Sequence, residues 1–145
     1  MKENITNERI IMNMINSFLG RMHLASHLEL LTEEQFTLVK EGVEYYNSLT
    51  EAKKTALPYF PNGFTSFGEK VVAAGFKTAE KLYLAVWNLG EEERTLDIET
   101  KEKFASACVG YPKADKSEIS LKDGKISIKM QAKNARMIEL KRISN

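Results

Sequence analysis

The sequence contains little cysteine and no long apolar run. Among its 145 residues there is one cysteine, Cys108, and two histidines. A single cysteine excludes an internal disulfide and a metal site built from several cysteines. Cys108 lies in the apolar stretch FASACVG, which predicts a buried, unreactive thiol. The chain opens without a basic and apolar leader and has no run of membrane-spanning length, so we expect a cytoplasmic protein that does not bind membranes.

A strong excess of charge of either sign is also absent. The formal net charge is +1, with 28% charged and 43% hydrophobic residues. These values are typical of an ordinary globular protein with a substantial core. They argue against a polyanion as the main partner. The lysines after position 100 are spread among strand-like residues without a set of aromatic residues, which favours a solvated sheet face over nucleic-acid binding.

The first third of the chain has the periodicity of helices. Apolar residues recur at three- and four-residue spacing between positions 7 and 19, which predicts a helix with one buried face. They are Ile10, Ile11, Met14, Ile15 and Phe18. A second helix is predicted from a capping box, Thr32 with Gln35, to about Leu49. Between the two helices, the apolar stretch RMHLAS at residues 21–26 predicts a short strand buried on both faces, so the order is helix, strand, helix.

The rest of the sequence has the patterns of β-strands. After the stretch PYFPNGF, about seven short apolar runs are separated by turn residues. KLYLAVWN at residues 81–88 is apolar on both faces, which predicts a central strand. Asp123-Gly124 is the pair that a two-residue hairpin turn prefers. This pattern predicts a mainly β protein with a C-terminal antiparallel Greek-key β-sandwich, divided into a segment 1–57 and a β domain 58–145.

One long stretch is distinctive. It reads MINSFLGRMHLASHLELLTEEQFTLVKEGVEYYNSL and is followed by FPNGF, KVVAAGF and LYLAVWNLGEEERTLDI. This succession resembles the C-terminal end of bacterial α-galactosidases (melibiases) of glycoside hydrolase family 36, from about Ile10 to Leu140. The resemblance implies that residues 1–57 are the end of a (β/α)8 catalytic barrel and that a small β domain follows. Because a complete barrel takes about 250 residues, the chain can hold only its last part.

The resemblance also implies a reaction. In the family, two aspartates on barrel strands upstream of the matched segment hydrolyse terminal α-galactosides with retention. Retaining glycosidases place the two carboxyl groups about 5–5.5 Å apart. Asp97, Asp115 and Asp123 are the only aspartates of the chain, and none matches a catalytic motif. We therefore expect no catalytic residue, no cofactor and no activity in the isolated chain, and a galactoside or oligosaccharide substrate only for the full enzyme.

Two residues are candidates for substrate binding in the full enzyme. Ser26 and His27 follow the predicted barrel strand, and the resemblance places them at the rim where active sites of this fold gather; packing beneath the site is the alternative. His23, His27 and Glu29 invite a zinc site, but we expect no metal because the segment reads as a strand and a further ligand is missing. Trp87 is a candidate sugar-stacking platform, although its position within a strand favours a core or interdomain role.

The exposed apolar surface of such a fragment has a further consequence. Tyr59, Phe60 and Phe64 are expected to pack between the barrel and the β domain, and without the barrel they and the first helix would be exposed. Exposed patches of this kind drive association, so we expect a homo-oligomer through the N-terminal helices. Two other functions stay open: a non-catalytic carbohydrate-binding module, and an interaction protein that reuses part of an enzyme.

Overall fold

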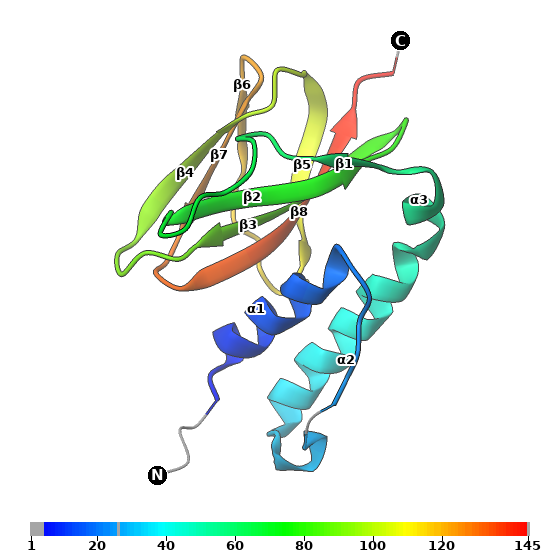
Figure 1. Cartoon of the computed structure of the whole chain (residues 1–145), viewed down its shortest axis with the longest axis vertical. Coiled ribbons are helices and arrows are strands. Elements are labelled where there is room, and N and C mark those ends of the chain that lie inside the picture. The colour runs from blue at the N-terminus through cyan, green and yellow to red at the C-terminus, as the bar shows by residue number, and fades with distance from the viewer. Residues whose placement is uncertain (1–4, 26, 145) are drawn as a thin grey trace.

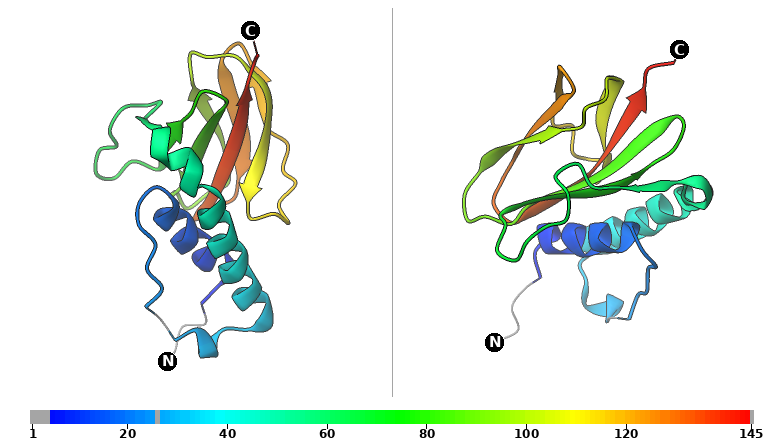
Figure 2. Two further views of the ribbon diagram at one scale, coloured as in Figure 1. Left: turned by 90° about the vertical axis from the view of Figure 1, so that its right-hand side faces the viewer. Right: turned by 45° about the horizontal axis from the view of Figure 1, so that its top comes forward.

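A computed structural model describes residues 5–25 and 27–144. In this part of the chain a helical layer, a five-stranded sheet and a three-stranded sheet lie on one another (Figures 1 and 2). The helices are α1 (Asn7–Phe18), α2 (Glu33–Ser48) and α3 (Thr50–Thr55), with a 3-10 turn at Leu28–Leu30. The strands are β1 (Leu57–Tyr59), β2 (Val71–Lys77), β3 (Lys81–Asn88), β4 (Arg94–Glu99), β5 (Phe104–Tyr111), β6 (Ser120–Lys122), β7 (Lys125–Met130) and β8 (Asn134–Arg142). None of these helices is long and apolar enough to cross a membrane.

The strands pair as the sequence pattern predicts. Every pair is antiparallel, and the sheets have the orders β1-β2-β3-β8-β5 and β4-β7-β6. Because β3 pairs with β8 and β4 with β7, strands far apart in the sequence are neighbours, as in Greek-key sandwiches. The predicted antiparallel β-sandwich is therefore confirmed. β3 is the central strand of the larger sheet, as its two apolar faces predicted.

Local signals set the start of the helices and one hairpin. Thr32 Oγ1 accepts a hydrogen bond from the N–H of Gln35 at 3.2 Å, and the N–H of Thr32 donates to Gln35 Oε1 at 3.1 Å, which completes the predicted capping box of α2. Between β6 and β7, Asp123 and Gly124 have φ of 51° and 76°, the positive values that a type I′ turn requires. The cap and the turn are therefore both confirmed.

The five-stranded sheet is buried on both faces because its side chains alternate between two cores. Along β3, Leu82 and Leu84 pack against the three-stranded sheet. Tyr83 and Ala85 point the other way and pack with the helices. The right-hand view of Figure 2 shows α1 and α2 lying along that second face. Successive residues of a strand face opposite sides, so a strand apolar on both sides belongs in the middle layer.

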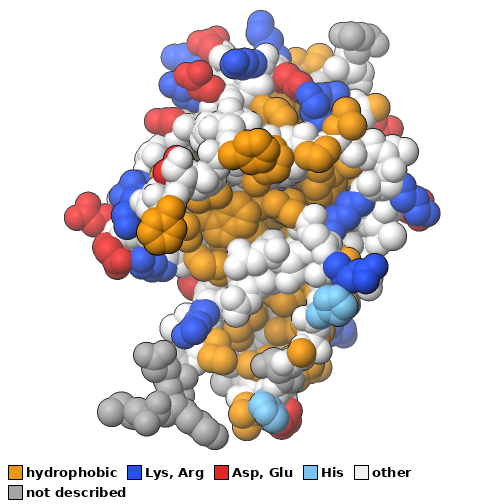
Figure 3. All heavy atoms as spheres, in the orientation of Figure 1, with side chains coloured by type: hydrophobic (Ala, Val, Ile, Leu, Met, Phe, Trp, Pro, Cys, Tyr) orange, Lys and Arg blue, Asp and Glu red, His pale blue; other side chains and the backbone are white. Residues whose placement is uncertain are grey.

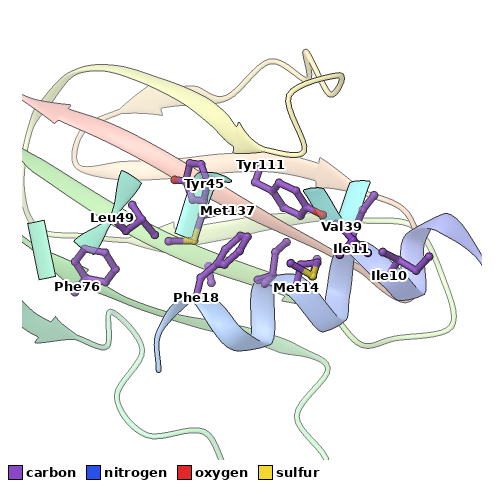
Figure 4. Packing of buried hydrophobic residues seen from close by; sticks show 13 residues of the cluster. Ile10, Ile11, Met14, Phe18, Val39, Tyr45, Leu49, Phe76, Tyr111 and Met137 are labelled. Carbon is purple, nitrogen blue, oxygen red and sulfur yellow. The ribbon is translucent and has the colours of Figure 1, made fainter. Parts of the chain in front are cut away.

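Aromatic rings form the centre of the core between the helices and the sheet. Phe18 of α1 lies between Tyr45 of α2 and Tyr111 of β5, with ring centroids 5.1 Å from each. Figure 4 shows these side chains converging on Met137 of β8. The hydroxyl of Tyr111 donates to the carbonyl oxygen of Leu38 in α2 at 2.9 Å. Tilted and edge-on ring pairs stabilise packing beyond the area that they bury, so the helices and the larger sheet share one tightly packed core.

The predicted strand at residues 21–26 is not formed. Residues 21–25 have no strand structure and run beside α2 (Figure 1), and Ser26 lies outside the described residues. A strand needs a neighbour that supplies hydrogen bonds, and the described chain places no strand next to this segment. The N–H of Met22 donates instead to the hydroxyl of Tyr46 at 3.4 Å. The order is therefore helix, irregular connection, helix.

The expectation that the first helix is exposed is also wrong. Ile15 and Phe18 are fully buried, and Ile10, Ile11 and Met14 are at most 6% exposed. These side chains pack on α2 and on the five-stranded sheet of the same chain. The apolar face of α1 therefore gives no physical reason to expect a homo-oligomer.

Cys108 differs from its prediction as well, because it is exposed. It lies on β5, at the edge of the five-stranded sheet, between Ala107 and Val109, which pack against the sandwich core. Alternation along the strand turns Cys108 to the opposite side. The apolar surroundings in the sequence indicated burial, but an edge strand built from small residues buries only one of its faces.

Gly75 lies in β2 at a position without room for a side chain. A Cβ there would stand 1.9 Å from the carbonyl oxygen of Tyr83 in β3. Gly75→Ala therefore forces β2 and β3 apart, and we expect it to lower the free energy of unfolding by about 2–4 kcal/mol. Urea denaturation followed by circular dichroism measures the change.

Gly20→Ala is the matched control, because no atom lies within 4 Å of the place that its Cβ would take. We expect it to change the free energy of unfolding by no more than about 0.5 kcal/mol. If the two variants unfolded at the same urea concentration, the close approach of β2 to β3 would be contradicted.

Candidate functional site

The connection between α1 and α2 carries the residues predicted to bind substrate. His23, Leu24 and His27 are exposed there. The Nδ1 atom of His27 lies 2.8 Å from Oε1 of Glu29, and both side chains are exposed. Glu29 also lines an open hollow of about 550 Å³ at the start of α2, with Phe36 on its wall. The structure thus pairs His27 with Glu29, while Ser26 stays outside the described residues.

The charge state of this pair follows from its hydrogen bonds. A backbone hydrogen bond at Glu29, and after it the hydrogen bond with His27, lower the pKa of the Glu29 carboxyl from its ordinary value. Glu29 is therefore a carboxylate acceptor, which places a proton on Nδ1 of His27 and leaves Nε2 facing solvent. Within the described residues, no group of three His, Cys, Asp or Glu is placed to hold a metal ion.

The aspartates have structural partners. Asp97 on β4 accepts a hydrogen bond from Ser127 on the neighbouring β7. Asp123 belongs to the turn between β6 and β7. Asp115, in the connection from β5 to β6, is paired with Arg136. The contacts of Asp97 and Asp115 are thus with a hydroxyl and a guanidinium, whereas a retaining glycosidase sets two carboxyl groups against the scissile bond.

A charge cluster surrounds Arg136 near the start of β8. Its guanidinium donates to the carboxylate of Glu8 in α1 at 2.8 and 3.0 Å, and also to Asp115. The side chain of Arg136 is only 11% exposed. Charge-assisted hydrogen bonds of this kind are stronger than neutral ones. The cluster therefore ties the helical layer and the β5–β6 connection to the central sheet.

The pKa values of Asp115 and Arg136 show that hydrogen bonding outweighs the effect of burial in this cluster. Burial by itself would raise the pKa of Asp115, but hydrogen bonds from Ser117 and Arg136 outweigh burial, so the pKa lies below its ordinary value. Burial by itself would lower the pKa of Arg136, but its hydrogen bonds with Glu8 and Asp115 raise it. Asp115 and Arg136 are therefore both charged near neutral pH.

Asp115 and Arg136 also line a cavity of about 410 Å³ at one end of the sandwich. Glu93, Glu118 and Asn134 are further members of its wall. No pattern in the sequence indicated this cavity. Its members come from four separate parts of the chain, and only the pairing of β4 with β7 and the turn into β8 bring them together. No short sequence motif could therefore predict that these residues lie together.

A second feature is the loop between β1 and β2, which is rich in exposed phenylalanine. Phe64 and Phe67 are 87% and 110% exposed. Phe60 packs on Phe64, with ring centroids 5.0 Å apart. Figure 3 shows hydrophobic side chains on the face formed by this loop and β2. A patch of this kind marks a surface that contacts another molecule or another part of a larger one.

Tyr59 and Trp87 have roles inside the molecule. Tyr59 was expected with Phe60 and Phe64 at an interface, but it is partly buried against the sandwich core, and its hydroxyl donates to the carbonyl oxygen of Thr100 at 2.9 Å. Trp87 packs with the helical core, and its Nε1–H donates to Asn16 of α1 at 2.9 Å. The core role predicted for Trp87 is confirmed.

Comparisons with known proteins add the class of protein in which this fold occurs. No protein family and no curated protein matches the chain. Among solved structures, a candidate α-N-acetylgalactosaminidase from Bacillus halodurans C-125 matches with a TM-score of 0.68 and 16% identity, over 97% of this chain and 33% of that one. An Anoxybacillus α-amylase matches with 0.58 and 13%, over 80% and 24%, and a glycoside hydrolase family 30 xylanase from Clostridium acetobutylicum with 0.55 and 10%, over 96% and 40%.

These similarities show a fold that occurs within glycoside hydrolases. The chain spans about a third of the length of the Bacillus halodurans protein and less than half of the other two. The match to the first covers the helices as well as the sandwich, because it includes nearly all of this chain. The resemblance to glycoside hydrolases is thus confirmed at the level of fold.

The Asp115–Arg136 pair predicts a pH-dependent stability. Since the pKa of Asp115 is lowered by folding, its contribution is present above the ordinary pKa and is lost as the pH falls through the lowered one. We expect Asp115→Asn to lower the free energy of unfolding by about 1–2 kcal/mol at neutral pH, since Glu8 still neutralises Arg136. The difference from the unaltered protein should shrink below about pH 4.

Asp123→Asn is the control, because asparagine also accepts the positive φ of the turn. Its stability should follow that of the unaltered protein at every pH. Urea denaturation at a series of pH values measures both variants. A deficit of Asp115→Asn that grew on acidification would contradict the charge assignment.

Proposed function

We propose that the chain is the C-terminal portion of an α-galactosidase-like retaining glycoside hydrolase and that its role there is structural. One observation carries the proposal. The fold of helices plus sandwich recurs over nearly the whole chain in a candidate α-N-acetylgalactosaminidase, and the sequence resembles family 36 through the same region. The cytoplasmic location predicted from the sequence is part of this proposal.

The connection between α1 and α2 supports the proposed place next to a barrel. Leu24 and Leu30 of this connection are 49% and 66% exposed, so the described chain does not cover them. Residues 21–25 include Met22, Leu24 and Ala25, and no strand of the described chain lies next to them. In a complete enzyme this segment pairs with the preceding barrel strand, which satisfies its backbone and buries its side chains. The Phe60–Phe67 loop provides a second contact with the same body.

Substrate contacts belong to this proposal too. With Nδ1 held by Glu29, the Nε2 atom of His27 is free to accept a hydrogen bond from a sugar hydroxyl. Ser26 precedes it and would offer a hydroxyl at the same rim. The two catalytic aspartates come from the other strands of the barrel, where one attacks the anomeric carbon and the other protonates the oxygen of the leaving group. In this proposal the chain supports and covers one end of the barrel, and residues outside the chain carry out the reaction.

The isolated chain is therefore expected to be inactive. Purified protein should release no nitrophenol from p-nitrophenyl α-galactoside or from the matching α-N-acetylgalactosaminide above the rate without protein. The reason is that the resemblance places both catalytic aspartates upstream of the matched segment, and none of Asp97, Asp115 and Asp123 matches a catalytic motif. Saturable release that follows the protein through a final size-exclusion column would overturn the structural role.

The exposed leucines give a second prediction. The double variant Leu24→Ser, Leu30→Ser should unfold within about 0.5 kcal/mol of the unaltered isolated chain, because neither side chain is part of its core. Leu49→Ala is the matched control inside the core, where the side chain is 2% exposed, and should lose about 2–4 kcal/mol. Chemical denaturation compares the three proteins.

The decisive experiment uses the DNA next to the coding sequence. A frame immediately upstream that encodes barrel strands ending in two aspartates supports the proposal. The protein expressed from the joined sequence should hydrolyse an α-galactoside, and the leucine double variant should lower its thermal midpoint. An upstream region without such strands, or a joined protein insensitive to both serines, would contradict it.

A further inference from the structure

The loop between β1 and β2 contains a dipeptide that occurs nowhere else in the chain. Asn62 is the only asparagine that is followed directly by a glycine. Both residues are exposed, and the left-hand view of Figure 2 shows the loop standing away from the sheets. The side-chain amide of an asparagine reacts with the backbone nitrogen of the next residue wherever the two can approach each other. The surroundings of Asn62 and Gly63 therefore decide whether this reaction takes place.

The backbone at Gly63 leaves the reacting nitrogen accessible. Its N–H donates to the carbonyl oxygen of Phe60 at 3.1 Å, which closes a single turn. Gly63 has a φ of 72°, and no atom lies within 4 Å of the place that a Cβ would take. Glycine has no side chain to shield its nitrogen, and it changes its backbone conformation easily. One hydrogen bond in an exposed loop opens at a small free-energy cost, so this nitrogen can reach Cγ of Asn62.

The other asparagines of the described chain lie in helices or strands. Regular structure fixes the backbone dihedral angles there, so the nitrogen of the next residue cannot turn towards the side chain. The next residue in each case also carries a side chain that crowds its nitrogen. These asparagines are Asn7, Asn13 and Asn16 in α1, Asn47 in α2, Asn88 in β3 and Asn134 in β8. The fold and the sequence thus single out the same residue, Asn62.

We propose that Asn62 is a site of spontaneous deamidation, a modification that gives the Phe60–Phe67 loop a negative charge. The backbone nitrogen of Gly63 loses its proton and attacks Cγ of Asn62, and the new C–N bond closes a five-membered succinimide ring. The bond from Cγ to Nδ2 breaks, and the leaving nitrogen takes up the proton and departs as ammonia. Water then opens the ring and leaves aspartate or isoaspartate at position 62. The reaction consumes only water, and no electrons are exchanged.

The new charge changes the apolar patch on this loop. Phe60 and Phe64 lie on the two sides of the reacting pair, with ring centroids 5.0 Å apart. A carboxylate beside them keeps its hydration, since burial of an unpaired charge is costly. The patch therefore becomes less apolar as the protein ages, and any contact that depends on it is weakened. The reaction needs only this loop and water, so it is independent of the structural role proposed above.

Incubation of the isolated chain in heavy-oxygen water tests this site. Peptide mass spectrometry follows the uptake of heavy oxygen at every asparagine over time. We expect position 62 to react at least about tenfold faster than the asparagines in helices and strands, because only the loop opens readily. Its rate should rise with pH, by up to about tenfold per unit, since the deprotonated nitrogen attacks. The modified protein should elute earlier from a hydrophobic-interaction column, together with Asn62→Asp.

Ser17→Gly is the matched control, because it places the same asparagine–glycine pair in α1. There the side chain of Asn16 also accepts a hydrogen bond from Nε1–H of Trp87 at 2.9 Å. Asn16 should keep its amide while Asn62 reacts in the same molecule. Ser48→Gly, which does the same for Asn47 in α2, replaces this control if circular dichroism shows that Ser17→Gly has lost its helices. The site is overturned if position 62 takes up no heavy oxygen, if its rate is independent of pH, or if the helical pair reacts as fast as Asn62.

Discussion

The burial of both faces of the five-stranded sheet is the constraint on which the rest of the structure depends. One face is covered by the smaller sheet and the other by α1 and α2. An apolar sheet face left open to water would expose a large patch, so the helices are required by the sheet as much as the sheet by the helices. This explains why the segment before the sandwich, which resembles part of another domain, packs as an integral layer of this chain.

The fold could be predicted from the sequence wherever a local pattern determines it. Thr32 with Gln35 and Asp123 with Gly124 act through bonds within a few residues, and KLYLAVWN revealed a strand with two buried faces. Errors arose where burial depends on a distant partner. The apolar face of α1 was predicted correctly, but the sheet that covers it belongs to a part of the chain more than fifty residues away. For the same reason an apolar sequence around Cys108 could not reveal an edge strand.

Residues 21–26 illustrate a different limit. Their composition is that of a buried strand, and the described part of the segment is neither buried nor a strand. The composition of a segment reflects the surroundings in which that segment is stable. The structure of a single chain, however, shows only the contacts that lie within that chain. The exposed Leu24 and Leu30 and the exposed phenylalanines after β1 are consistent with this explanation. They are apolar where the described chain leaves much of their surface uncovered.

The cluster around Arg136 connects separate parts of the molecule through charge. Because Glu8 and Asp115 neutralise Arg136 inside the protein, the cavity wall keeps its shape without a counter-ion. The same three residues therefore fasten both α1 and the β5–β6 connection to β8.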